Sequence, residues 1–134
     1  MNQLHQIRIT IVDANRNAVI NNLVNIRFLE GKAEEVLPML AAGYGDSDLV
    51  KLVQNANTVI LDPPRAGCEK SLIDSVLKVS PEKIVYVSCD PATLARDLKI
   101  FAENGYELVE VSPFDMFPWS VHVETIALIQ RVKS

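Results

Sequence analysis

The sequence predicts an α/β domain built around a mostly parallel sheet, and three observations favour this class. Short apolar runs of strand length alternate with longer segments that have helical periodicity. The runs at 58–61 and 84–87 are each followed by a turn that contains Asp-Pro, as expected where a strand ends. The 134 residues are 49% hydrophobic, which suits one domain with a buried sheet. Strands that alternate with helices in this way form parallel sheets.

Helices are predicted where apolar residues recur at the spacing of one helix face. Their expected ranges are 12–22, 33–42, 48–54, 69–79 and 91–104. Pro38 is expected to end or kink the second of these helices. Asp90 and Pro91 form an N-cap followed by a first-turn proline. A Ser-Pro pair at 80–81 and an Asn-Gly pair at 104–105 are expected to stop the last two helices.

Strands are predicted at 26–29, 58–61, 84–87, 106–111 and 121–132, and a glycine-containing loop is predicted at 43–47. The N-terminal segment allows two interpretations. Ile7, Ile9 and Ile11 alternate with polar residues, so residues 4–12 could form a strand and shorten the first helix. A helix from about residue 12 remains the main prediction for this segment.

Cys89 lies between the predicted strand 84–87 and the helix that starts after Asp90. A helix N-terminus favours the thiolate form, and a tight turn exposes the sulfur, as a nucleophile requires. The alternative is a small buried cysteine that packs beneath the turn. Cys68, which follows the Asp-Pro-Pro turn, is expected to serve packing alone.

Three motifs occur in a fixed order along the chain: DPPRAG at 62–67, SCDPATLARD at 88–97 and FPWSVHVE at 117–124. Together they resemble the RNA uracil-5-methyltransferase family, and the resemblance runs from about Val12 to the C-terminus. It implies a Rossmann-like methyltransferase fold whose sheet is mostly parallel with an antiparallel C-terminal strand. The implied activity is transfer of a methyl group from S-adenosyl-L-methionine to carbon 5 of a uridine in RNA.

The resemblance also implies roles for single residues. Cys89 matches the nucleophile that adds to carbon 6 of uracil, and Glu124 matches the base that removes the proton from carbon 5. Asp62 matches a contact to the methyl donor, with the uracil edge as a second candidate. The alternatives are a turn carboxylate for Asp62 and a strand-edge charge for Glu124. His122 is equally compatible with a structural and a catalytic role.

Several expected parts of the family's cofactor site do not match this sequence. The resemblance implies a first strand with a glycine-rich turn, and no GxGxxG-type loop occurs here. The acid for the ribose hydroxyls would fall near His5, and Lys32 stands near the adenine position. We therefore expect the C-terminal part of a catalytic domain in residues 1–134, with residues 1–11 poorly matched and the N-terminal strands missing. The missing strands would leave an exposed sheet edge beside the strand at 58–61. The strand at 26–29, the segment that starts at Leu4 or a second copy of the chain could pair with this edge, and pairing of two copies is the expected outcome.

Composition limits the other functions. A net charge of −4 argues against tight RNA binding by this piece, so ribosomal or transfer RNA is expected to bind through an absent N-terminal region. Two cysteines in unlike contexts suggest a reducing cytoplasm. No membrane span, signal peptide or metal-spaced cluster is present in the sequence. The rival functions are a non-catalytic binding module and a methyltransferase acting on an amino group through the Asp-Pro-Pro turn.

Overall fold

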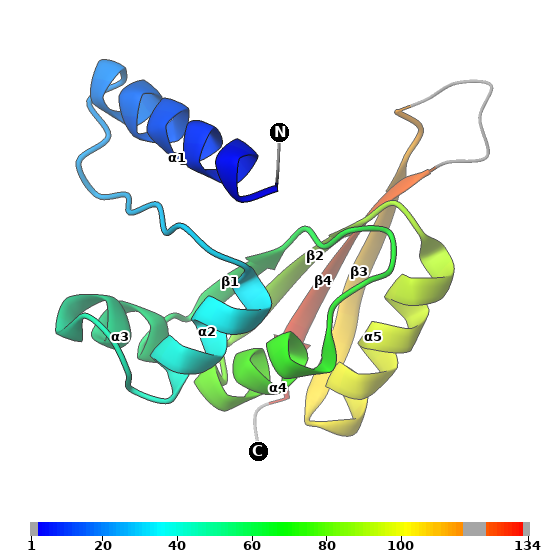
Figure 1. The fold of residues 1–134 in the computed structure, drawn as a ribbon. Helices are drawn as coiled ribbons and strands as arrows, with labels where there is room; N and C mark the ends of the chain where they lie inside the picture. Colours follow the sequence, from blue (N-terminus) through cyan, green and yellow to red (C-terminus); the bar gives the residue numbers. More distant parts are fainter. Residues whose placement is uncertain (1–2, 117–122, 133–134) are drawn as a thin grey trace. The chain divides into compact units, whose positions relative to one another are not determined.

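A computed structural model describes residues 3–116 and 123–132 (Figure 1). The chain divides into two compact units, Met1–Ala33 and Glu34–Ser134. Within the described residues, no helix has the length and apolar content needed to cross a membrane.

The first unit consists of helix α1 (Gln3–Ile20) and an irregular segment after it. The helix starts well before residue 12, so the predicted start was wrong, and so was the alternative of a strand at 4–12. The predicted strand at 26–29 was also wrong, because residues 23–32 form neither helix nor strand. A helix satisfies its backbone groups internally, whereas a strand needs a neighbour. The described part of this unit contains no second strand to supply one.

The second unit begins with two short helices. Helix α2 spans Ala33–Ala41 and continues through Pro38, so of the two predicted effects of this proline, an end of the helix was wrong. Proline cannot donate to the carbonyl four residues earlier, and here the Ser71 hydroxyl donates to that carbonyl of Glu34 at 3.5 Å. Helix α3 (Ser47–Gln54) is capped by Asp46, whose carboxylate accepts from the N–H groups of its first turn.

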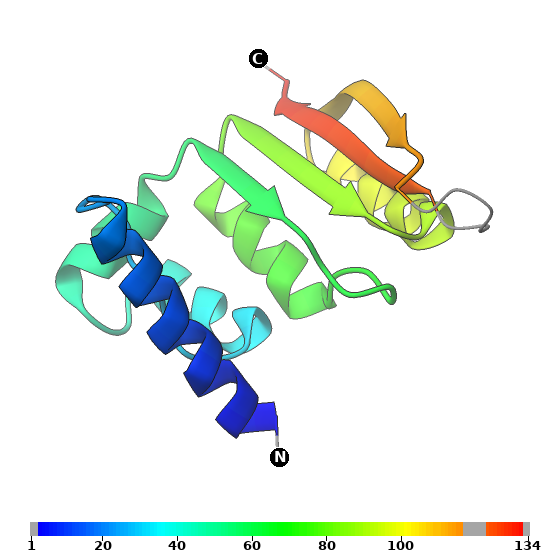
Figure 2. The same cartoon turned by 90° about the horizontal axis from the view of Figure 1, so that it is seen from above.

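A four-stranded sheet forms the centre of the second unit (Figures 1 and 2). Its strands are β1 (Thr58–Leu61), β2 (Lys83–Ser88), β3 (Tyr106–Phe114) and β4 (Glu124–Arg131), in the order β1-β2-β4-β3. β1 and β2 are parallel, and β4 runs antiparallel to both β2 and β3. Three strands therefore share one direction and the C-terminal strand opposes them, as predicted. β3 is longer than expected, because it pairs with β4 along its whole length apart from a bulge after Leu108.

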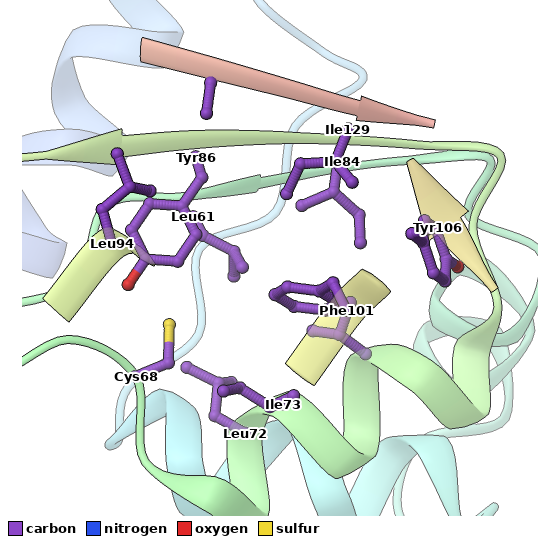
Figure 3. Packing of buried hydrophobic residues seen from close by; sticks show 12 residues of the cluster. Leu61, Cys68, Leu72, Ile73, Ile84, Tyr86, Leu94, Phe101, Tyr106 and Ile129 are labelled. Atoms are coloured by element: carbon purple, nitrogen blue, oxygen red, sulfur yellow. The ribbon is translucent and has the colours of Figure 1, made fainter. Parts of the chain in front are cut away.

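Helices α4 (Lys70–Val79) and α5 (Pro91–Glu103) lie on the same face of this sheet (Figures 1 and 2). Their apolar sides meet alternate residues of the strands, since successive strand residues point to opposite faces. In β2, Ile84, Tyr86 and Ser88 are buried while the residues between them are partly exposed. Figure 3 shows the resulting core, in which the ring of Phe101 packs edge-on against Tyr106 with ring centroids 6.0 Å apart.

Candidate active site at the carboxyl edge of the sheet

The three residues expected to carry the chemistry all lie at the same end of the strands, where β1 and β2 finish and β4 begins. Cys89 directly follows β2, Glu124 is the first residue of β4, and Asp62 directly follows β1. The last β2–β4 pair is Ser88 with Thr125, so Cys89 and Glu124 are the next residues beyond this pair on their two strands. Neighbouring strands lie about 4.8 Å apart, which brings the backbones of these two residues close together.

Asp62 is on the other side of β2. Because Leu61 pairs with Tyr86, Asp62 falls level with Val87, two residues before Cys89. The side chain of Asp62 is exposed, whereas Cys89 and Glu124 are half-buried. Ligands of open α/β sheets bind outside the carboxyl ends of parallel strands, which is where Asp62 and Cys89 lie.

The turn that carries Cys89 is fixed by its neighbours. The Ser88 hydroxyl donates to the Asp90 carbonyl at 2.8 Å and accepts from the Asp90 N–H at 3.1 Å. The Asp90 carboxylate in turn accepts from the N–H groups of Thr93 and Ala92, each at 3.0 Å. These hydrogen bonds, that from Thr93 first, hold the pKa of Asp90 below its ordinary value, with a further contribution from Arg65. The predicted N-cap is thus present, and it orients Cys89 at the start of α5.

The loop after β1 is held against α5 by four side chains of that helix and its cap. Their contacts are Asp90 with the Arg65 guanidinium at 3.7 Å, Thr93 with the Arg65 carbonyl at 3.0 Å, Arg96 with the Ala66 carbonyl at 3.0 Å, and Asp97 with the Cys68 N–H at 2.8 Å. Within the loop, the Gly67 N–H donates to the Pro64 carbonyl at 2.8 Å and closes a turn. Sequence analysis did not identify this contribution of Thr93, Arg96 and Asp97.

Asp97 is the buried centre of these contacts. Its side chain is 0% exposed, and it accepts from the Tyr86 hydroxyl at 2.6 Å as well as from the Cys68 N–H. Arg96 donates to its other carboxylate oxygen at 2.9 Å. Burial, followed by the hydrogen bond to Asp97, raises the pKa of Tyr86 well above its ordinary value. Tyr86 therefore acts as a donor to this carboxylate.

Cys68 lies in the core beneath this loop, as expected for a packing role. Figure 3 shows its sulfur and the Tyr86 hydroxyl pointing toward one another. Burial is the main cause that raises the pKa of the Cys68 thiol, so the neutral, unreactive form is favoured. This environment contrasts with that of Cys89, which is partly exposed at the edge of the sheet.

Gly67 allows the loop to approach α5 closely. Its φ of +80° lies in the left-handed region, and a Cβ at this position would come within 2.5 Å of an Arg96 nitrogen and 2.7 Å of an Asp97 oxygen. A side chain at residue 67 is therefore incompatible with both the backbone and the neighbouring pair.

The remaining predictions for the site concern His122, a metal ion and the glycine-rich turn of the cofactor site. His122 lies outside the described residues, so its two candidate roles are not distinguished. The described part of the chain contains no group of three or more side chains suited to a metal ion. It also contains no glycine-rich turn between a strand and a helix, the feature expected to hold the methionine end of the cofactor.

A family model described as tRNA (Uracil-5-)-methyltransferase matches residues 6–132. The chain therefore belongs to the tRNA (uracil-5-)methyltransferase family.

Individual relatives agree with this membership. Two bacterial proteins, each named an uncharacterized RNA methyltransferase, are 50% identical over 125 residues (Clostridium acetobutylicum) and 43% identical over 121 residues (Halalkalibacterium halodurans). These matches cover 91% and 90% of this chain but only 25% and 24% of the relatives. The chain thus spans about a quarter of their length.

A solved structure is similar in both sequence and fold. The Pyrococcus abyssi tRNA (uracil-54, C5)-methyltransferase, solved in complex with S-adenosyl-L-homocysteine, is 37% identical with a TM-score of 0.68. The similarity covers 91% of this chain and 26% of that one.

Proposed function

We propose that this chain is the C-terminal part of the catalytic domain of an S-adenosyl-L-methionine-dependent RNA methyltransferase that methylates carbon 5 of a uridine. The observation that carries the proposal is the β2–β4 register. It sets a partly exposed cysteine and a glutamate next to each other, one residue beyond the pair formed by Ser88 and Thr125. Family membership and the methyltransferase relatives support the same reaction.

The chemistry explains why a thiol and a carboxylate are needed side by side. Carbon 5 of uracil is a weak nucleophile until a group adds to carbon 6 and pushes electron density into the ring. The Cys89 thiolate makes that bond, and carbon 5 then becomes able to accept a methyl group. Glu124 takes the proton from carbon 5, after which the ring double bond re-forms and the Cys89 thiolate leaves. Splitting the reaction into these steps replaces one high barrier with several lower ones.

When bound, S-adenosyl-L-methionine supplies an electrophilic methyl group. Asp62 fits one contact to this donor, because its carboxylate is exposed at the carboxyl end of β1 and can accept hydrogen bonds from amine or hydroxyl groups. A carboxylate at this place can also accept from the uracil edge.

The RNA substrate is proposed to bind mainly through a region outside this chain. A net charge of −4 leaves little attraction for a phosphate backbone. Transfer RNA and ribosomal RNA are both compatible with the proposed chemistry. Arg65, on the exposed loop after β1, is the candidate in this chain for a phosphate contact.

A covalent-trapping experiment tests the proposal. The full-length gene product is incubated with S-adenosyl-L-methionine and RNA that contains 5-fluorouridine. Fluorine cannot be removed as a proton, so the Cys89 adduct should persist and shift the protein in denaturing electrophoresis. Mass spectrometry should place the RNA on the peptide with Cys89.

The matched variants are Cys89→Ala, which should abolish the adduct, and Cys68→Ala, which should preserve it because that thiol is buried in the core. An undiminished adduct with Cys89→Ala would show that the nucleophile is wrongly assigned. Methylation that survives Cys89→Ala would instead favour transfer to an amino group, since that chemistry needs no thiol.

A further inference from the structure

Helix α5 presents one polar side to the loop at 62–68. Starting from the cap, the residues on this side are Asp90, Thr93, Arg96 and Asp97. Each of them contacts the loop, through the Arg65 guanidinium, the Arg65 carbonyl, the Ala66 carbonyl and the Cys68 N–H respectively. Residues three and four apart share a helix face, so the four contacts follow from the helical repeat. These contacts hold the loop at residues 65, 66 and 68.

The Arg96–Asp97 pair anchors the far end of this loop. Asp97 is fully buried, and a buried carboxylate is stable only when its oxygens are paired. The Cys68 N–H supplies one of the required hydrogen bonds, at 2.8 Å. Arg96 binds the carboxylate and also donates to the Ala66 and Cys68 carbonyls, at 3.0 and 3.4 Å. Opening the loop would therefore remove a hydrogen bond from a buried charge.

The same pair is connected to the turn that carries Cys89. Tyr86, which donates to Asp97, lies in β2 three residues before Cys89 and is paired with Leu61, the residue before Asp62. α5 itself begins directly after the Cys89 turn. The two site turns, one with Asp62 and one with Cys89, are therefore both attached to one helix and one buried carboxylate.

We propose that Arg96 and Asp97 are positioning residues that set the distance between Asp62 and Cys89 by clamping the Asp62–Cys68 loop onto α5. The proposal rests on the proposed function, because it assigns Asp62 and Cys89 to the donor and nucleophile sides of one reaction. Small displacements between reacting groups are costly, with about 1 Å able to reduce a rate by roughly 10²-fold. A loop that carries one of these groups needs such an anchor.

The clamp is tested first by the reactivity of Cys68, which is 7% exposed and should become accessible when the loop opens. The full-length gene product is alkylated with N-ethylmaleimide under native conditions, and the tryptic peptide 66–70 is quantified by mass spectrometry. Arg96→Ala should increase the labelling rate of Cys68 at least tenfold. Lys99→Ala is the matched control, because Lys99 is an exposed base of α5 that pairs with Glu103. It should label at the wild-type rate.

Kinetics then test whether the clamp positions the site. Arg96→Ala should lower kcat/KM for S-adenosyl-L-methionine by ten- to a hundredfold while the KM for RNA changes less than twofold. Arg96→Lys, which keeps a charge but can serve fewer acceptors, should recover part of the loss. If Arg96 had a merely structural role, its removal would lower the amount of folded enzyme. The kcat/KM for S-adenosyl-L-methionine per folded enzyme would then stay at the wild-type value, as would the KM for RNA.

The outcomes separate the two proposals. Unchanged Cys68 labelling or unchanged kinetics in Arg96→Ala, in an enzyme that methylates uridine through Cys89, would overturn the clamp alone. Should the wild-type gene product methylate no uridine, the proposed function is wrong and the positioning role is wrong with it.

Discussion

Replacing Tyr86 with phenylalanine removes a single hydroxyl from the core and leaves the ring in place. That hydroxyl donates at 2.6 Å to the buried Asp97 carboxylate, which keeps its bonds from the Cys68 N–H and Arg96. A hydrogen bond to a charged group contributes about 1.5–3 kcal/mol to folding stability. We therefore expect Tyr86→Phe to lower the free energy of unfolding by about 2 kcal/mol.

Tyr106→Phe is the internal comparison for this change. The Tyr106 hydroxyl is also buried, but it donates to a neutral acceptor, the Pro81 carbonyl, at 2.8 Å. Neutral hydrogen bonds contribute about 0.5–1.5 kcal/mol, so this variant should lose about half as much. Urea denaturation of both variants, with unchanged dependence on denaturant, measures the difference. A loss in Tyr86→Phe no larger than in Tyr106→Phe would refute the account of Asp97 as a charged anchor.

The pH dependence of the free energy of unfolding gives a second test of Tyr86→Phe. The pKa values of Tyr86 and Cys68 are raised in the folded state from ordinary values of 10.0 and 9.0. The unfolded chain therefore releases these protons first, and the stability they contribute is complete below about pH 9 and is lost as the pH rises further. Tyr86→Phe should reduce this alkaline loss. If Tyr86→Phe loses stability as steeply as the wild-type chain when the pH rises, groups other than Tyr86 cause the alkaline loss.

Three further results are expected. Glu124→Gln should slow release of the product by about 10²–10⁴-fold, because the amide cannot accept the proton from carbon 5, and methylated RNA should then accumulate on the protein even with ordinary uridine. Full turnover by this variant would place the base elsewhere. The 134-residue chain alone should show no micromolar binding of S-adenosyl-L-methionine in calorimetric titration, since its sequence has no glycine-rich turn, and a micromolar dissociation constant would contradict this. The chain should self-associate in sedimentation velocity experiments, because β1 is an edge strand of the described sheet and Ile60 is 71% exposed. Ile60→Lys should weaken this association, and a wild-type chain that stays monomeric at all concentrations would exclude it.

Local sequence determined the elements that depend on nearby residues. The strands at 58–61 and 84–87 and the helix after Asp90 were predicted within a residue or two of their observed ends. Their signals are the apolar run, the N-cap and the first-turn proline, all of which act within a few residues. The three motifs likewise pointed to Asp62, Cys89 and Glu124, and the roles of these residues stay predictions.

Tertiary structure decided the features that need a distant partner. Residues 26–29 have a strand-like sequence but form no strand, because pairing depends on a neighbour that the described part of their unit does not provide. The proximity of Cys89 to Glu124 follows from the antiparallel register of β2 and β4, which lie far apart in sequence. In the sequence, nothing distinguishes Arg96 and Asp97 from other charged residues of a helix. In the folded chain, Asp97 is buried against the Tyr86 hydroxyl and the Cys68 N–H. The cost of burying an unpaired charge depends on the whole fold, so periodicity alone could not identify this pair.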